Sequence, residues 1–123
     1  MAKRSARFGI KRVYDAPSAD DGARVLVDRL WPRGLSKSRA AIDLWLREIA
    51  PSDALRKWFS HDPARWGEFC ARYAAELADH ADEAARLRAM LGQGPVTVLY
   101  GAKDEAHNNA VALVDYLLAR DDD

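Results

Sequence analysis

The chain has 123 residues, of which 49% are hydrophobic and 31% are charged, the profile of one globular domain rather than of a disordered segment. Nineteen basic residues balance nineteen acidic ones, so the net charge argues against gross electrostatic attraction to nucleic acid or to an anionic membrane. No stretch approaches the roughly 20 apolar residues of a membrane span, and the single cysteine cannot form an intrachain disulfide. We therefore expect a cytoplasmic protein of one α/β domain spanning residues 1–123.

The amino-terminal segment Met1 to Arg12 is basic, but no apolar core follows it, so it does not have the pattern of a secretory signal. We interpret it as a solvated basic tail that leads into a first strand, in preference to a nucleic-acid-binding arm. Residues 1–6 and 120–123 are expected to be flexible.

Three segments have strand patterns. Phe8 to Tyr14 alternates apolar and basic residues, whereas Arg24 to Asp28 and Val96 to Tyr100 each contain an unbroken apolar run, which suits a strand covered on both faces. The long helical stretch between the second and third strands favours a parallel pair joined by a right-handed crossover. The link between the first two strands has only nine residues, so a hairpin remains open there.

Helical patterns fill the middle of the chain. Ser52 opens a short helix, and Asp62 followed by Pro63 is a strong start for a longer one. A further helix over Ala81 to Leu91 either continues that longer helix or kinks away from it near His80. The expected buried positions are, in the first helix, Ile42, Trp45, Leu46 and Ile49, ended by Pro51; in the second, Leu55, Trp58 and Phe59; and in the third, Trp66, Phe69, Cys70, Tyr73, Ala74 and Leu77.

Asp104 is expected to cap a last helix at its amino terminus. The buried face predicted for that helix consists of Ala106, Ala110, Leu113, Val114 and Leu117. Ligands of open parallel sheets bind beyond the carboxyl ends of the strands, and two polar loops, 29–37 and 101–109, leave those ends here. If their strands are neighbours, the two loops face each other.

The first loop carries two arginines, Arg29 and Arg33, whose planar guanidinium groups suit carboxylate or phosphate. Pro32 stiffens the loop and biases Trp31 toward an extended conformation, and Gly34 permits a positive φ. Two structural alternatives stay open. In the first, Arg29 pairs with a nearby acid such as Asp28 or Asp43 and does not bind a ligand. In the second, Trp31 only packs against the rest of the protein.

The second loop carries Lys103, His107 and Asn108 close to a helix start, where free N–H groups favour an anion. His107 is the candidate general acid or base, because its charge changes near neutral pH. The alternative is that His107 serves only as a local hydrogen-bonding group. The predicted ligand-binding residues are Arg29, Trp31, Arg33, Gly34, Lys103 and Asn108.

We predict no cofactor and no metal. A metal site can be drawn from His61, Asp104 and His107, but no metal-ligand spacing supports it. Gly-rich phosphate loops, serine elbows and paired carboxylates are also missing from the sequence. Cys70 lies on the buried stripe of its helix and is expected to be inert.

Several segments resemble the bacterial YeaO-like proteins, a branch of a larger family of domains of unknown function. The resemblance is carried by 27–37 (VDRLWPRGLSK), 45–52 (WLREIAPS), 55–63 (LRKWFSHDP) with Trp66, and 95–100 (PVTVLY) with Asp104, His107 and Asn108. The resemblance implies a compact three-layer α/β fold and a location in the bacterial cytosol. It implies no particular reaction, because no reaction is established for the family. Other branches carry cysteines in the segment corresponding to residues 100–108. This chain has none there, so a thiol-dependent activity would not transfer to it.

The favoured hypothesis is a pocket that binds or transforms a small phosphorylated or carboxylated ligand. Arg29, Arg33 and Lys103 would neutralise the ligand, and His107 would transfer protons. One alternative is a nucleic-acid-binding or regulatory module, although no helix-turn-helix with a basic recognition helix is recognisable. The other is a protein-interaction domain without chemistry, which would use exposed aromatic residues such as Trp31. The ligand and the oligomeric state stay undecided.

Overall fold

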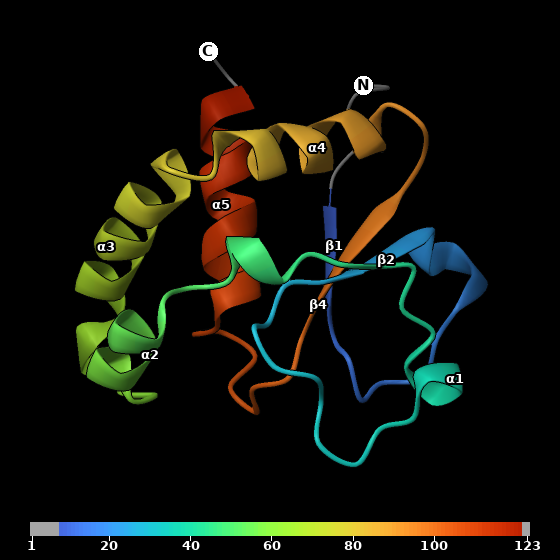
Figure 1. The fold of residues 1–123 in the computed structure, drawn as a ribbon, viewed down its shortest axis with the longest axis horizontal. Helices are drawn as coiled ribbons and strands as arrows, with labels where there is room; N and C mark the ends of the chain where they lie inside the picture. Colours follow the sequence, from blue (N-terminus) through green and yellow to red (C-terminus); the bar gives the residue numbers. More distant parts are fainter. Residues whose placement is uncertain (1–7, 122–123) are drawn as a thin grey trace.

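The computed structural model describes residues 8–121, which form a four-stranded parallel sheet with helices packed around it (Figure 1). The strands are β1 (Phe8–Arg12), β2 (Ala23–Leu26), β3 (Leu44–Trp45) and β4 (Val96–Tyr100), and their order in the sheet is β1-β4-β2-β3. The predicted α/β class with a small parallel sheet is therefore confirmed.

The link between β1 and β2 is not a hairpin, because both strands pair in parallel with β4, which lies between them. The residues at the two ends of this link hydrogen-bond at the two ends of β4. The Val13 N–H donates to the Tyr100 carbonyl at 2.8 Å, and the Ala23 N–H donates to the Pro95 carbonyl at 3.0 Å. The link can therefore be short, because it only has to span the length of β4.

The helices are α1 (Lys37–Ala40), α2 (Asp53–Phe59), α3 (Trp66–Ala78), α4 (Ala81–Leu91) and α5 (Asn109–Asp121), with 3-10 turns at Ala19–Asp21, Arg47–Ile49 and Pro63–Arg65. Ser52 caps α2, and Asp62 caps the turn that leads into α3, as the sequence predicts. The stretch after His80 forms a separate helix, α4.

The helix predicted from Ile42 to Ile49 is wrong. Leu44 and Trp45 form β3 instead, because the chain is hydrogen-bonded as an extended strand beside β2: the Asp43 N–H donates to the Arg24 carbonyl, and the Leu46 N–H donates to the Leu26 carbonyl. Tertiary pairing overrides the helical spacing of the apolar residues. The long helical crossover consequently joins β3, rather than β2, to β4.

The last helix starts later than predicted, at Asn109, and residues 102–108 form a bent loop. Asp104 caps this loop and not the helix, since its Oδ1 accepts the N–H groups of Ala106 and His107 at 2.9 and 3.0 Å. Ala106 is exposed in the loop, whereas Ala110, Leu113, Val114 and Leu117 are buried as expected.

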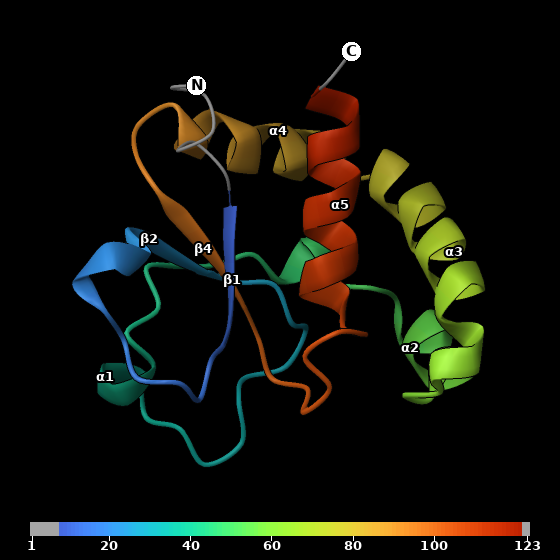
Figure 2. The ribbon, with the colours of Figure 1, turned by 180° about the vertical axis from the view of Figure 1, so that it is seen from behind.

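Each face of the sheet has its own apolar core. Helices α2 to α5 cover one face, where Val25, Val98 and Tyr100 meet the buried residues of the helices. On the other face Leu26 and Leu99 pack against Ala40 of α1 and the loop before it. In Figures 1 and 2, accordingly, α5 and α1 lie on opposite sides of the sheet.

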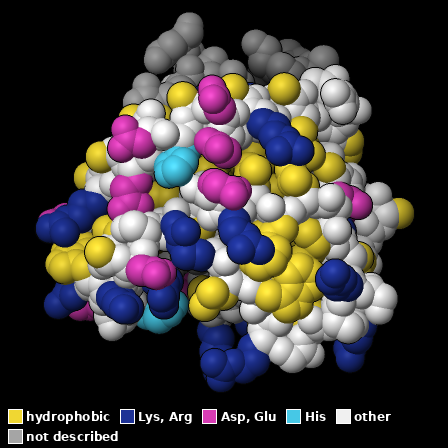
Figure 3. Space-filling view, in the orientation of Figure 1, with side chains coloured by type: hydrophobic (Ala, Val, Ile, Leu, Met, Phe, Trp, Pro, Cys, Tyr) yellow, Lys and Arg dark blue, Asp and Glu magenta, His cyan; other side chains and the backbone are white. Residues whose placement is uncertain are grey.

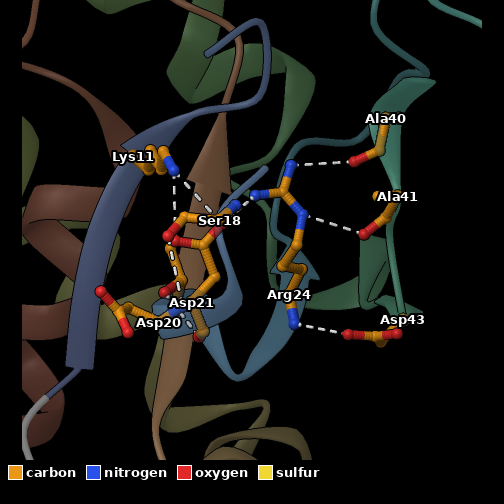
Figure 4. Close-up of polar contacts among 9 residues, drawn as sticks. Lys11, Ser18, Asp20, Asp21, Arg24, Ala40, Ala41 and Asp43 are labelled. Atoms are coloured by element: carbon orange, nitrogen blue, oxygen red, sulfur yellow. Dashed lines mark hydrogen bonds and ion pairs between the residues drawn. The ribbon is translucent and has the colours of Figure 1, made fainter. Parts of the chain in front are cut away.

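A buried ion-pair network lies at the amino end of the sheet (Figure 4). The Arg24 guanidinium donates to Asp21 at 2.5 Å and to the Ala40 and Ala41 carbonyls at 2.8 and 2.9 Å. Lys11 donates to the same carboxylate at 3.1 and 3.2 Å. Burial opposes ionisation of Asp21, but its hydrogen bonds with Ser18, Lys11 and Arg24 outweigh burial and lower its pKa.

No helix between residues 8 and 121 is long and apolar enough to cross a membrane. Of the ends predicted to be flexible, residues 1–6 and 122–123 lie outside the described residues, while residues 120 and 121 belong to α5.

Candidate functional site

A pocket of about 330 Å³ lies beyond the carboxyl ends of β2 and β4. Residues 28–33 after β2 and residues 101–109 around the loop after β4 supply most of its wall, and residues of α2 and α3 close it from the side. The two strands are neighbours, so the predicted opposition of the two loops is confirmed.

Hydrogen bonds between the loops hold the pocket in shape. Asp28 Oδ2 accepts the Gly101 N–H at 2.8 Å, and a side chain at Gly101 would place its Cβ 3.0 Å from that oxygen. The Asn109 amide donates to Asp28 Oδ1 and to the Val27 carbonyl, both at 3.0 Å. The Tyr14 hydroxyl donates to the Arg33 carbonyl at 3.0 Å. These hydrogen bonds tie the loops to one another and to the segment after β1, which limits the movement of the pocket wall.

Five of the predicted site residues line this one pocket: Arg29, Trp31, Arg33, His107 and Asn108. Gly34 and Lys103 are not among the lining residues. Gly34 has the predicted positive φ, 76°, and thus shapes the loop that presents Arg33. Lys103 is exposed outside the lining.

The two arginines of the first loop have different surroundings. Arg29 is held by the protein: its Nη2 donates to the Ala50 and Pro51 carbonyls at 3.3 and 3.4 Å, and its Nε lies 3.9 Å from Asp53 Oδ1. The expected acidic neighbour exists, but it is Asp53 rather than Asp28 or Asp43. The side chain of Arg33 is exposed and makes no hydrogen bond or ion pair within the described part of the chain.

Trp31 contributes both to packing and to the pocket. Its Nε1–H donates to the Leu35 carbonyl at 2.6 Å, and its ring meets Trp45 edge-on with centroids 5.4 Å apart. These contacts fix the loop on the second core, and the same indole also lines the pocket.

His107 is oriented by Asp104, whose Oδ2 lies 3.0 Å from His107 Nδ1. Hydrogen bonds from the Ala106 backbone and from His107 lower the pKa of Asp104, so this carboxyl stays ionised and favours a proton on Nδ1. The edge-on contact with Trp66, at 5.3 Å between centroids, holds the ring from another side. In the neutral imidazole Nε2 is then the free acceptor.

The Asn108 side chain is already engaged. Its Oδ1 accepts the Val111 N–H at 2.9 Å, and its Nδ2 donates to the Asp104 carbonyl at 3.0 Å. Asn108 therefore caps the start of α5, the role that the sequence assigned to Asp104.

The sequence did not single out several lining residues as site candidates, among them Asp28, Arg56, Phe59 and Phe69. Asp28 had a usable signal, because it follows the apolar run of the second strand at the end where ligands bind. His61, which was considered from the sequence as part of a metal site, lies in the pocket wall with an unusual φ of 55°. Arg56 and the two phenylalanines come from the helical crossover, whose path the sequence does not define.

Asp28 is the one carboxyl among the residues that line the pocket. Burial raises its pKa, although the hydrogen bonds from Asn109 and Gly101 act in the opposite direction. Tyr73 is buried and donates its hydroxyl to the Ile49 carbonyl at 2.6 Å. Burial, with the nearby charges of Asp28 and Glu76, raises the pKa of this phenol.

The described residues that line the pocket include no cysteine and no group of side chains that could hold a metal ion. Cys70 is half-buried on α3, away from the lining, and burial together with Asp115 raises its pKa. Among residues 8–121 no group of three or more His, Cys, Asp or Glu side chains is placed to hold a metal ion.

The charge of the lining is predominantly positive. Three arginines and two histidines, Arg29, Arg33, Arg56, His61 and His107, stand against the single carboxyl of Asp28. Figure 3 shows Lys and Arg side chains, with a histidine beside them, gathered along the lower part of this face of the molecule. This arrangement can bind an anion and can exchange protons with it through an imidazole.

Comparison with known proteins gives sequence relatives but no solved structure that matches. The chain is 47% identical over 107 residues to the "Uncharacterized protein YeaO" of Escherichia coli, covering 87% of this chain and 93% of that protein. It is 40% identical over 117 residues to the "Uncharacterized protein Rv3073c" of Mycobacterium tuberculosis, covering 95% and 98%. The model of the family DUF488-N3i, described as the inactive DUF488-N3 subclade, matches residues 7–123. The chain therefore belongs to the inactive DUF488-N3 subclade.

Proposed function

We propose that this protein binds a small phosphorylated or carboxylated anion in the pocket beyond β2 and β4. The observation that carries the proposal is the set of five basic side chains around one carboxyl. Two of the five, Arg33 and His61, make no hydrogen bond or ion pair within residues 8–121. Basic side chains without a protein partner beside a cavity are available to a ligand.

The loop that carries Arg33 supports this role. Pro32 is buried, Tyr14 holds the Arg33 carbonyl, and Trp31 is tied to the Leu35 carbonyl at 2.6 Å. A guanidinium presented from a fixed backbone loses less conformational entropy on binding than one from a mobile loop. The Arg33 side chain itself stays free to close on the anion.

The proposal is one of binding rather than of turnover, in keeping with the description of the subclade as inactive. No cysteine is among the lining residues, so thiol chemistry has no nucleophile in this pocket. His107, the proton-transfer candidate of the sequence, offers Nε2 to the ligand because Asp104 engages Nδ1. Lys103 and Gly34 are left out of the proposed contacts.

Isothermal titration with inorganic phosphate and with benzoate tests the proposal. We compare the wild-type protein with Arg33→Gln, and we use Arg86→Gln on α4 as the matched control, because Arg86 is also exposed and does not line the pocket. A charge-assisted hydrogen bond contributes about 1.5–3 kcal/mol, so Arg33→Gln should weaken the better-bound anion by about tenfold or more. Arg86→Gln should bind like the wild type.

Two results would overturn the proposal. In one, neither anion binds the wild-type protein, or Arg33→Gln binds as tightly as Arg86→Gln. In the other, a single-stranded oligonucleotide binds with a steep dependence on salt and phosphate does not displace it, which would favour the nucleic-acid-binding alternative.

A further inference from the structure

Asp28 is a feature that a simple anion pocket does not explain. It lies in the pocket wall directly after the strand, and its two carboxyl oxygens accept one hydrogen bond each, from Asn109 at 3.0 Å and from Gly101 at 2.8 Å. An ionised carboxylate has about four acceptor positions, so its acceptor capacity is only partly used.

No cation of the described chain neutralises Asp28. Its sequence neighbour Arg29 turns to Asp53, and the two groups that hydrogen-bond to Asp28 are neutral amides. A partly buried carboxyl with no positive partner is costly to ionise, and in the wall of an anion pocket it also repels the ligand. It would be tolerated there if the ligand itself brought a donor.

The apolar part of the pocket wall indicates which kind of ligand body would fit beside it. The rings of Phe59 and Phe69 lie with centroids 4.5 Å apart, both side chains are buried, and both line the pocket together with Pro51. This surface suits a flat or apolar body rather than a bare ion. A volume of about 330 Å³ is at the small end of the range for ligand pockets, which fits a metabolite and not a polymer.

We propose that the ligand combines three features: an anionic group for Arg33 and His61, an apolar or aromatic body against Phe59 and Phe69, and an N–H donor that binds Asp28. This inference rests on the proposed function and specifies its ligand. An amino acid supplies these features through its ammonium group, and a nucleotide supplies them through the N–H groups of its base.

Matched pairs of ligands test the inference on the wild-type protein by isothermal titration. L-phenylalanine is compared with 3-phenylpropionate, which lacks the amino group, and adenosine 5′-monophosphate is compared with purine riboside 5′-monophosphate, which keeps the purine ring but lacks its amino group. In one of the two pairs the donor-bearing member should bind about tenfold tighter or better, since a hydrogen bond to a charged group contributes about that much. The pair that shows the difference identifies the source of the donor.

The Asp28→Asn variant assigns the preference to this residue. It removes the charge at nearly constant size, so the ratio of affinities within the discriminating pair should fall toward one. The donor-free member should bind more tightly than before, because a repulsive charge is gone. This second effect separates a specific role of Asp28 from general damage to the pocket. If the variant does not fold, the matched pairs on the wild-type protein still decide the inference.

The failures of the two proposals are distinguishable. If phosphate, benzoate or 3-phenylpropionate binds through Arg33 but the donor-bearing members gain nothing, the donor inference is wrong and the anion pocket stands. If none of the probes binds, the proposed function fails, and with it this inference. A preference that persists undiminished in folded Asp28→Asn also overturns the assignment.

Discussion

Arg24, at the amino end of β2, and Arg33, in the loop beyond the carboxyl end of that strand, have opposite surroundings. At the amino end of β2, each of the three nitrogens of the Arg24 guanidinium donates a hydrogen bond, to Asp21 or to the Ala40 and Ala41 carbonyls. Beyond the carboxyl end, the Arg33 side chain is exposed and has no partner within the described residues. The amino-end network serves the fold, whereas Arg33 is available to a ligand beyond the carboxyl end, where Arg29 and Arg56 are paired with Asp53.

The comparison separates charges that hold the fold together from charges that have no partner in the described part of the chain. A buried charge that is fully hydrogen-bonded positions elements, here α1 and the segment before β3, against the sheet. Exposed charges beside a cavity that have no internal partner are solvated and contribute little to folding, so they are available to a ligand. Three experiments test whether the two regions differ in this way.

Arg24→Met should have the largest effect on stability. It leaves Asp21 buried with Lys11 as its one remaining cation, and it leaves two buried carbonyls without their donor. We expect the free energy of unfolding to fall by about 3–5 kcal/mol, measured by urea denaturation. Arg39→Met, at an exposed position of α1, is the control and should change it by less than about 0.5 kcal/mol. Equal effects of the two variants would contradict the structural role of the network.

The pH dependence of stability should have opposite signs in the two regions. The pKa of Asp21 is lowered in the folded state, so Asp21 stabilises the protein above about 3.8, the ordinary pKa of this group, and its contribution is lost as the pH falls below that value. The pKa of Asp28 is raised, so its ionisation between pH 3.8 and the folded-state pKa destabilises the protein as the pH increases.

Urea denaturation of Asp21→Asn and Asp28→Asn across pH 3 to 7 measures both signs. The stability advantage of the wild type over Asp21→Asn should shrink at the acid end of this range. Its stability relative to Asp28→Asn should instead decline as the pH rises from 3.8. Each variant is the control for the other, and slopes of the same sign would show that the two carboxyls do not differ as described.

Changing Arg33 and His61 should have the smallest effect on stability. His61→Asn keeps a residue type that tolerates the positive φ of 55°, and Arg33→Gln removes no internal contact of the described chain. The double variant should unfold within about 0.5 kcal/mol of the wild type while losing anion binding. A large loss of stability would mean that these side chains belong to the fold, like Arg24.

Local patterns in the sequence were sufficient for much of this architecture. The apolar runs around Val25 and Val98, with helices between them, favoured a parallel pair of strands, and Asp62 with Pro63 predicted the start of the longest stretch of crossover helix. Such features depend on residues close together in the chain, where capping and side-chain periodicity act directly. The same reasoning brought Arg29, Trp31, Arg33, His107 and Asn108 to one end of the sheet.

Tertiary contacts decided the rest. The helical spacing around Trp45 gave way to strand pairing beside β2, because backbone hydrogen bonds to a neighbouring strand are not encoded in local spacing. The partner of Arg29, the capping role of Asn108 and the entry of Phe59, His61 and Phe69 into the pocket depend on how distant segments pack. Sequence alone placed the pocket at the ends of two strands. Only the folded chain showed which basic side chains of the pocket are paired with other residues of the protein. It also showed that the carboxyl of Asp28 lies in the wall among these basic side chains.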